Sequence, residues 1–169
     1  MTDISLKKDS IMSNSYKDKI YDIAVNIFEV TCYMFPMEEW EFEDTQIQPI
    51  PEDGVSSVVG FNGAAKGDLI ITPSSELYSA IASNMLGVVE PDESQKSGAL
   101  CEIANIICGN TVPLFADTEH ICYIKPPRII ESKDEMPSRP DDAKEEVLQL
   151  YLDEGQVEIR IYYSLKGGS

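Results

Sequence analysis

The stretch from Ser97 to Asn110 constrains the folding of this chain most tightly, because its apolar residues recur at helical spacing. On an α-helix, one side of this stretch is apolar and wide enough to be buried in a core. That side carries Leu100, Ile103, Ala104, Ile107 and Cys108. The other side is a narrow stripe, here called the polar stripe, made of Gly98, Glu102, Asn105 and Gly109. Because a glycine inside a helix costs about 1 kcal/mol relative to alanine, two glycines on this stripe favour a contact surface for a bulky partner.

Helical and strand-like patterns alternate along the rest of the chain. Apolar residues recur at helical spacing over 16–35, and again after Thr72-Pro73, where a capping hydroxyl and a proline predict a helix start. Asn62-Gly63 separates two strand-like segments and predicts a hairpin with a type I′ turn. Alternating residues around Glu154-Gly155 predict a second hairpin. The order of these elements indicates two related halves. The apolar set of the first helix is Ile20, Ile23, Ile27, Val30 and Met34.

The length of 169 residues indicates a single domain. We expect residues 1–13, which are polar and irregular, to form a disordered tail and residues 14–169 to form the domain. Within the domain, residues 132–146 are charged, contain two prolines and show no periodicity. We interpret that segment as a mobile loop inserted within the sheet.

The charge balance limits the partners of the chain. Thirteen basic and 30 acidic residues give a net charge of −17, which disfavours nucleic acid and anionic membrane surfaces because their phosphates would be repelled. No uninterrupted apolar run approaches the ~20 residues of a membrane span, and the first residues lack a secretory pattern. We therefore predict a cytoplasmic protein with neither nucleic acid nor membrane as a partner.

Four cysteines and one histidine offer little for a metal site or a thiol enzyme. Structural zinc sites need close ligand pairs, and no Cys-x-x-Cys pair is present, so we predict no metal site. Cysteines packed in a reducing compartment are the better interpretation. Cys122 and His120 would share one face of a strand, but no third orienting group follows, so a thiol phosphatase is discounted.

The pattern Glu102-x-x-Asn105-x-x-x-Gly109-Asn110 resembles the signature of the CheC/CheX chemotaxis phosphatases. The resemblance extends over roughly residues 16–165, and it implies an α/β fold of the α+β kind: a pseudo-symmetric, mostly antiparallel sheet with helices packed on it. CheC-type members carry the Glu-x-x-Asn pair in both halves. The first helix here offers only Asp22 and Asn26, which lack that pattern, so the chain resembles a CheX-like member. The supporting segments are the helix end Phe28–Met34, the hairpin glycines Gly60, Gly63 and Gly67, and the helix end Asn84–Gly87.

The resemblance implies a phosphatase that hydrolyses the aspartyl phosphate of a CheY-like response regulator. Asn105 would orient the attacking water, and Glu102 would dock to a lysine of the regulator, which makes these two residues the candidate catalytic pair. Together with Gly98 and Gly109 they would form the partner-binding surface. The Mg²⁺ would belong to the partner's receiver domain, so this chain would need no cofactor. A homodimer paired through sheet edges is also implied.

The leading alternative is a non-catalytic module, similar to CheC or to the middle domains of flagellar switch proteins, that binds a response regulator or another signalling partner. Gly98 favours this alternative, since the family often has Asp or Ser at that position. Exposed glutamate is ordinary on helix surfaces, and asparagine also occurs there without a role. Binding without accelerated dephosphorylation would distinguish the module from the enzyme.

Overall fold

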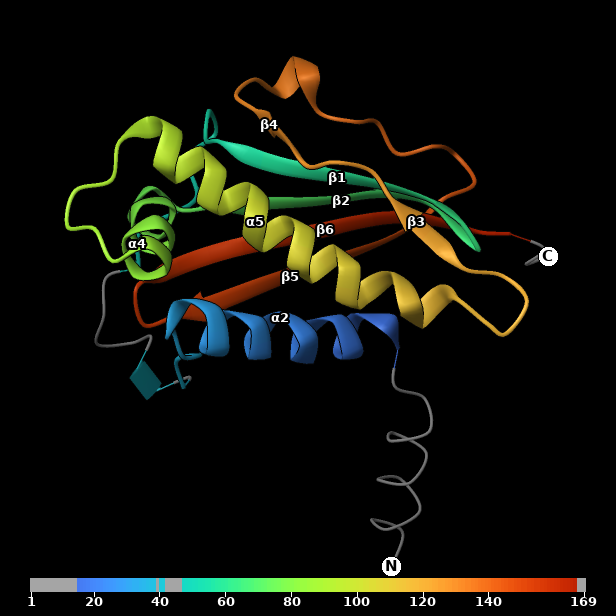
Figure 1. Ribbon diagram of the computed structural model, residues 1–169, viewed down its shortest axis with the longest axis horizontal. Coiled ribbons are helices and arrows are strands. Elements are labelled where there is room, and N and C mark those ends of the chain that lie inside the picture. Colours follow the sequence, from blue (N-terminus) through green and yellow to red (C-terminus); the bar gives the residue numbers. More distant parts are fainter. Residues whose placement is uncertain (1–14, 39, 42–46, 167–169) are drawn as a thin grey trace, which may run out of the picture.

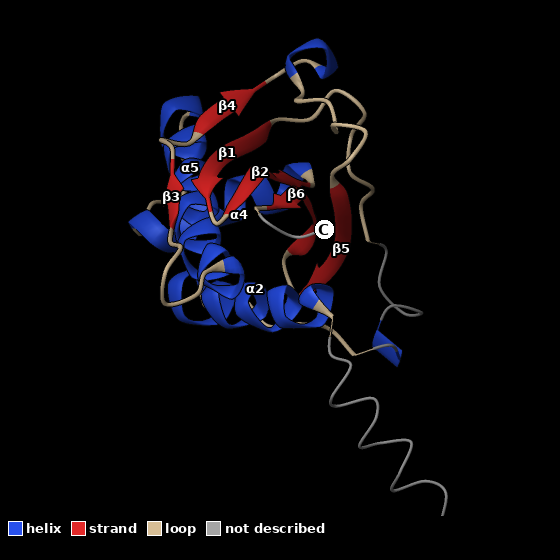
Figure 2. Ribbon diagram, turned by 90° about the vertical axis from the view of Figure 1, so that its right-hand side faces the viewer, coloured by secondary structure: helices blue, strands red, loops and turns tan. Residues whose placement is uncertain are grey.

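The computed structural model describes residues 15–38, 40–41 and 47–166, which form one antiparallel sheet with three α-helices on one face (Figures 1 and 2). The expected α+β fold class is confirmed, while the predicted tail, residues 1–13, lies outside the described residues. The strands are β1 (Ser56–Gly63), β2 (Ala65–Pro73), β3 (Cys122–Ile124), β4 (Arg128–Ile130), β5 (Lys144–Leu152) and β6 (Gly155–Leu165). The helices are α2 (Tyr16–Cys32), α4 (Ser75–Leu86) and α5 (Glu93–Thr111), with 3-10 turns η1 (Val112–Phe115) and η2 (Lys133–Glu135).

The strand order is β3-β1-β2-β6-β5, and β4 also pairs with β1. The central strands β2 and β6 pair from Ala65 opposite Leu165 to Pro73 opposite Val157. Their hairpin partners, β1 and β5, lie on either side. On the outer side of β1, the strands β3 and β4 complete one edge of the sheet, and both follow α5 in the chain. On the outer side of β5, a single bridge joins Leu152 to Pro36, which follows α2 in the chain. Each half therefore contributes a helix, an outer segment and a hairpin, as the predicted pseudo-symmetry requires.

The main core lies between the sheet and the helices. Alternate residues of each strand face the helices because successive side chains of a strand point to opposite faces. On β6 these are Val157, Ile159, Ile161 and Tyr163, all of them buried against helix residues such as Phe28, Leu77 and Ile103. The other face has a smaller cluster of Val58, Ile70, Ile130 and Tyr162, covered in part by Met136. The segment that contains Met136 crosses the helix-free side of the sheet (Figure 2).

The first predicted hairpin is confirmed, but its predicted type I′ turn is wrong. Strands β1 and β2 pair up to Phe61 opposite Gly67. A type I′ turn needs a positive φ at both central residues, and Tyr33 is the one non-glycine with a positive φ in the described part of the chain. Asn62 and Gly63 instead extend β1, where they lie opposite Tyr123 and Cys122 of β3.

The predicted start of the second helix is two residues too early. β2 continues through Pro73, and Ser74 is the N-cap of α4, with its hydroxyl oxygen accepting from the Leu77 N–H at 3.4 Å. The Thr72 hydroxyl lies 2.7 Å from the Ser56 hydroxyl instead. The predicted helix end at Gly87 is confirmed, since this residue has a φ of 69° and forms the C-cap.

The charged segment predicted as a loop over 132–146 ends earlier than expected. β5 begins at Lys144, so the last three residues of that segment belong to the sheet. The two carboxylates among them have cross-strand partners: Arg160 Nη1 lies 3.2 Å from Glu145 Oε1, and the Tyr163 hydroxyl donates to Glu146 at 3.3 Å. The mobility of the remaining loop stays a prediction.

We predict that Gly155→Ala destabilises the protein by about 1–3 kcal/mol, because position 155 combines steric overlap with an unfavourable backbone conformation. Gly155 has a φ of 147°, and an added Cβ would lie 2.7 Å from Ser74 Oγ and 2.9 Å from Leu77 Cβ. Gly98→Ala is the matched control, since nothing lies within 4 Å of its added Cβ, and it should stabilise the helix by about 0.5–1 kcal/mol. Urea unfolding followed by circular dichroism measures the free energy of unfolding of both variants. Equal changes in the two variants would contradict the steric overlap and strain described for position 155.

Candidate functional site

The start of α5 is fixed by a capping box. The Gln95 N–H donates to the Asp92 carboxylate at 2.8 Å, and the Asp92 N–H donates to the Gln95 side-chain oxygen at 2.9 Å. Such a cap satisfies helix N–H groups that would otherwise lack partners and stabilises the helix by about 1 kcal/mol. The cap therefore sets the residue at which the helix begins, with Asp92 as the N-cap and Glu93 as the first helical residue.

The apolar side of α5 is buried as predicted, and this burial sets the rotation of the helix. Its residues face the sheet and the helices α2 and α4. Because this side is held in the core, the polar stripe on the opposite side faces outward. Figure 1 shows α5 lying across the sheet, with no other described helix or strand over it. The buried residues are Ala99, Leu100, Ile103, Ala104, Ile107, Cys108 and Thr111.

The polar stripe is accessible along its length. Gly98, Glu102 and Gly109 are exposed, and Asn105 is half-buried. Among the described residues, no atom of a neighbouring group lies within 4 Å of a Cβ built on Gly98, and Ile124 Cδ1 lies 3.9 Å from a Cβ built on Gly109. With a rise of 1.5 Å per residue, the two glycines are separated by about 16 Å along the helix axis. The stripe is thus an open surface long enough to contact a helix turn or a loop of another protein.

The two polar side chains of the stripe are available to another molecule. The side chains of Glu102 and Asn105 make no hydrogen bond or ion pair with any residue that the structure describes. Asn110, at the end of the same helix, differs because its Nδ2 donates to the Ile106 carbonyl at 2.8 Å. An amide without an internal partner can donate and accept hydrogen bonds at once, so Asn105 is free to hold a water or a group of another molecule.

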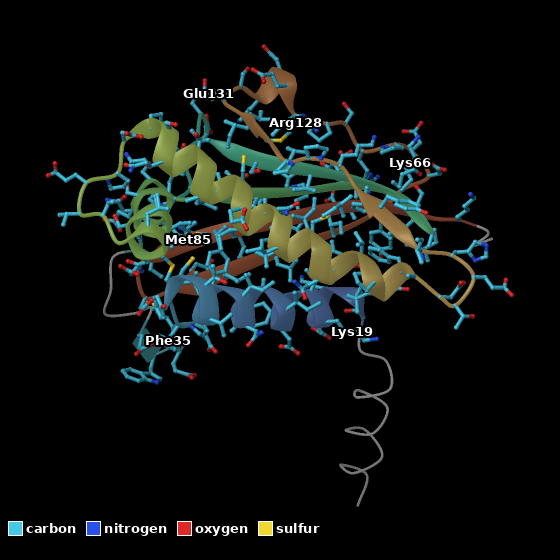
Figure 3. The ribbon with its side chains drawn as sticks, in the orientation of Figure 1. Lys19, Phe35, Lys66, Met85, Arg128 and Glu131 are labelled. Carbon is cyan, nitrogen blue, oxygen red and sulfur yellow. The ribbon has the colours of Figure 1, made fainter. Side chains whose placement is uncertain are left out.

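The rim of the stripe contains a residue that sequence reasoning missed. Ile124 of the edge strand β3 lies beside Gly109 and is partly exposed. Arg128 in β4 and Glu131 directly after it lie on the side of α5 where β3 and β4 run (Figures 1 and 3). The alternation of β3 does not reveal this neighbour, because the contact depends on how the sheet edge lies against the helix end.

The thiols do not form the nucleophilic pair considered above. His120 lies before β3, with its Nδ1 3.1 Å from Asp117 Oδ1, whereas the Cys122 sulfur accepts from the Ala65 N–H at 3.4 Å. Burial raises the pKa of Cys108 to about 12, and burial together with the nearby Glu154 carboxylate raises the pKa of Cys32 to about 12. Within 15–38, 40–41 and 47–166, no three His, Cys, Asp or Glu side chains form a group that could hold a metal ion.

The span Glu93–Phe115 is long and apolar enough to cross a membrane by length and composition. In this fold it contains α5 and η1, whose apolar residues Leu100, Ile103 and Ile107 are fully buried against the sheet. The span is therefore a core helix of the domain.

Comparisons with known proteins agree with this architecture. Over residues 55–150 the chain matches the model of the family described as chemotaxis phosphatase CheX. A comparison with curated proteins found no match. A chain in the crystal structure of the CheX–CheY–BeF3–Mg²⁺ complex from Borrelia burgdorferi is 22% identical, with a TM-score of 0.69, over 88% of this chain and 97% of that one.

Two further structures show the range of the likeness. The chemotaxis protein CheX from Vibrio vulnificus is 19% identical, with a TM-score of 0.67, over 90% of this chain and 100% of that one. The middle domain of FliM from H. pylori is 11% identical, with a TM-score of 0.52, over 88% of this chain and 87% of that one. At these identities the structures establish the fold.

We predict that iodoacetamide leaves Cys32 and Cys108 unmodified in the folded protein. The thiolate is the reactive form, and both groups combine burial with a raised pKa. Cys101 and Cys122 are partly exposed and should be modified first. Mass spectrometry of peptides after labelling at pH 8 measures this order, and labelling in urea, where all four should react, is the control. Rapid modification of Cys108 in the folded state would contradict the packing described here.

Proposed function

Because the chain belongs to the CheX family of chemotaxis phosphatases, we propose that it hydrolyses the aspartyl phosphate of a CheY-like receiver domain. The observation that carries the proposal is the pair of an exposed Glu102 and a half-buried Asn105 on one face of α5, whose side chains have no partner among the residues that the structure describes. The Borrelia structure is a complex of CheX with CheY, BeF3 and Mg²⁺, and that assembly is the kind of complex we propose for this chain.

Asn105 would act by placing a water molecule. An amide neither takes up nor releases a proton at neutral pH, but it holds water through its oxygen and its NH₂ group. Phosphoryl transfer depends mainly on positioning and charge stabilisation, because its transition state is loose and the attacking oxygen must lie in line with the leaving group. A water held by Asn105 would form the new P–O bond while the bond to the aspartyl oxygen breaks. The aspartate leaves as a carboxylate, and the proton of the water leaves with the inorganic phosphate or passes to solvent.

Glu102 would anchor the helix to the receiver. Its carboxylate lies one turn before Asn105 on the same face, so it would reach a lysine beside the phosphorylated aspartate while the amide enters the pocket. A charge pair of this kind orients the partners and raises the association rate. We assign the Mg²⁺ that assists such a hydrolysis to the receiver domain, so this chain would supply the amide and the docking carboxylate.

The glycines and the neighbouring strand would shape the docking surface. Without side chains at 98 and 109, a receiver loop or helix can approach the α5 backbone closely, and Ile124 would add apolar contact at one end of the stripe. On the resemblance alone we also propose a cytoplasmic homodimer that pairs through a sheet edge. A monomer mass in sedimentation equilibrium would contradict the dimer.

The second candidate is a receiver-binding module without activity. It is favoured by Gly98, where the family often has Asp or Ser, and by the likeness of the fold to the FliM middle domain. Such a module would use the same stripe for binding and would leave the rate of dephosphorylation of the receiver unchanged.

We predict that Asn105→Ala lowers phosphate release from a phosphorylated CheY-like receiver domain by about 100-fold, because the attacking water loses its positioning group. Docking should change little, since Glu102 and both glycines remain. The matched control is Asn110→Ala, which removes the same group from the same helix but outside the stripe. If Asn105→Ala hydrolyses the phosphate as fast as the parent protein, the catalytic assignment is wrong. If the parent protein binds the receiver without accelerating hydrolysis, the second candidate holds.

Glu102→Lys is expected to weaken docking about tenfold, which corresponds to about 1.4 kcal/mol, because a lysine would face the lysine of the receiver. Hydrolysis at saturating receiver should fall less than docking does. Glu90→Lys makes the same change in charge outside the stripe and should leave the dissociation constant unchanged. Titration by fluorescence anisotropy measures both variants; equal affinities for Glu102→Lys and the parent protein would remove Glu102 from the interface.

A further inference from the structure

A second group of exposed side chains belongs to neither the core nor the polar stripe. It comes from the end of α2, the segment that follows α2 and the end of α4. We call this group the aromatic patch, and each of its members is more than half exposed. Monomeric proteins rarely expose several large apolar residues from neighbouring elements unless these residues contact a partner. The members are Val30, Tyr33, Phe35, Trp40 and Leu86.

Hydrogen bonds hold the elements of the aromatic patch together. Asn84 Nδ2 donates to the Cys32 carbonyl at 2.8 Å and so joins the end of α4 to the end of α2. Phe35 and Asp153 are joined twice, since the Phe35 N–H donates to the Asp153 carboxylate at 3.1 Å and the Asp153 N–H donates to the Phe35 carbonyl at 3.0 Å. Phe35 and Met85, which precedes Leu86, lie at the same end of the molecule (Figure 3). These bonds fix the backbone of the patch at the end of α2, at Phe35 and at the end of α4.

Tyr33 has an unfavourable backbone conformation, and its side chain contributes little to the stability of the fold. It forms the C-cap of α2 with a φ of 55° and a ψ of 37°, in the left-handed region where glycine is favoured. Its N–H donates to the Glu29 carbonyl at 3.1 Å, a bond that glycine would make equally well. The side chain is 69% exposed, so it buries little area in return. Because unfavourable backbone conformations are concentrated at functional positions, the exposed ring of Tyr33 is a candidate contact for another molecule.

The charge around the patch limits what can bind there. Acidic residues come from α2, from the segment that follows it and from the turn between β5 and β6, whereas the stretches 20–65, 67–95 and 145–159 contain no lysine or arginine. An anionic membrane would be repelled, and so would a second copy of the chain carrying the same acidic rim. A partner that combines apolar and basic groups is complementary to both parts of the surface. The acidic residues are Glu29, Glu38, Glu41, Asp153 and Glu154.

We propose that the aromatic patch binds a basic amphipathic helix of a partner protein. The apolar face of that helix would cover Tyr33, Phe35 and Trp40, and its lysine and arginine side chains would reach the acidic rim. Exposed aromatic residues provide much of the binding energy in interfaces of this type. The patch lies on the ends of α2 and α4 and on the segment after α2, whereas the polar stripe lies on α5, so this binding does not depend on the proposed phosphatase activity.

Trp40 makes the proposal directly testable, because it is the single tryptophan of the chain and belongs to the patch. The probe is a synthetic peptide in which leucine and lysine recur at helical spacing, and the control peptide replaces each lysine by glutamate. We expect the leucine–lysine peptide to shift the Trp40 emission to shorter wavelength in a saturable way, and the affinity to fall as salt is added. The leucine–glutamate peptide should cause no shift.

Tyr33→Gly should weaken binding of the leucine–lysine peptide about tenfold or more, while the thermal unfolding midpoint stays the same or rises because glycine accepts this backbone conformation. Tyr123→Ser removes a comparably exposed ring from β3 and should leave the affinity unchanged. Unchanged affinity of Tyr33→Gly, or equal binding of both peptides, would overturn the proposal. So would a dimer of the parent protein that Tyr33→Gly dissociates, or a Trp40 shift caused by vesicles of anionic lipid.

Discussion

Burial of the apolar side of α5 is the interaction on which both the fold and the candidate site depend. Leu100, Ile103 and Ile107 are fully buried, and each such side chain contributes about 1.5–3 kcal/mol when it leaves water. Because of their spacing, these three side chains are all buried in only one orientation of the helix about its axis. Turning the helix far enough to bury Glu102 would move a carboxylate into the core without a partner, which costs several kcal/mol or forces its neutralisation. The contacts that stabilise the domain therefore also hold the polar stripe outward.

Elements governed by local pattern could be predicted from the sequence, and those governed by distant pairing could not. Helix α5 and the second hairpin follow from periodicity within a single segment. The turn at Asn62-Gly63 could not be predicted, because β3, which follows in the chain only after two helices, pairs with these residues and keeps them extended. Either Thr72 or Ser74 could cap α4. The pairing of Pro73 with Val157 decides between them, because it keeps β2 extended up to the cap.

The same distinction applies to the surfaces. The polar stripe could be predicted because helical spacing alone places its four residues together. The aromatic patch could not, since exposure depends on which neighbours cover each residue. Val30 and Met34 share the apolar pattern of the first helix, yet Met34 is fully buried and Val30 is 64% exposed. The helix ends at Cys32 and the chain turns at Tyr33. Met34 is therefore buried next to the edge of the sheet, where Pro36 bridges to Leu152, while Val30 stays on the solvent side of the helix.

The proposed function gives a physical reason for a neutral residue, Asn105, at the centre of the stripe in so acidic a chain. A protein with a net charge of −17 gains no long-range attraction to a phosphorylated partner, so short-range contacts would have to hold the proposed complex. A carboxylate at position 105 would approach the phosphate with like charge and would raise the energy of the loose, negatively charged transition state. An amide of nearly the same size avoids that repulsion and still holds a water. Among the 30 acidic residues, Glu102 is the one on the stripe. It lies one helical turn away from the amide, so in the proposed complex Glu102 would contact a lysine of the partner and not its phosphate.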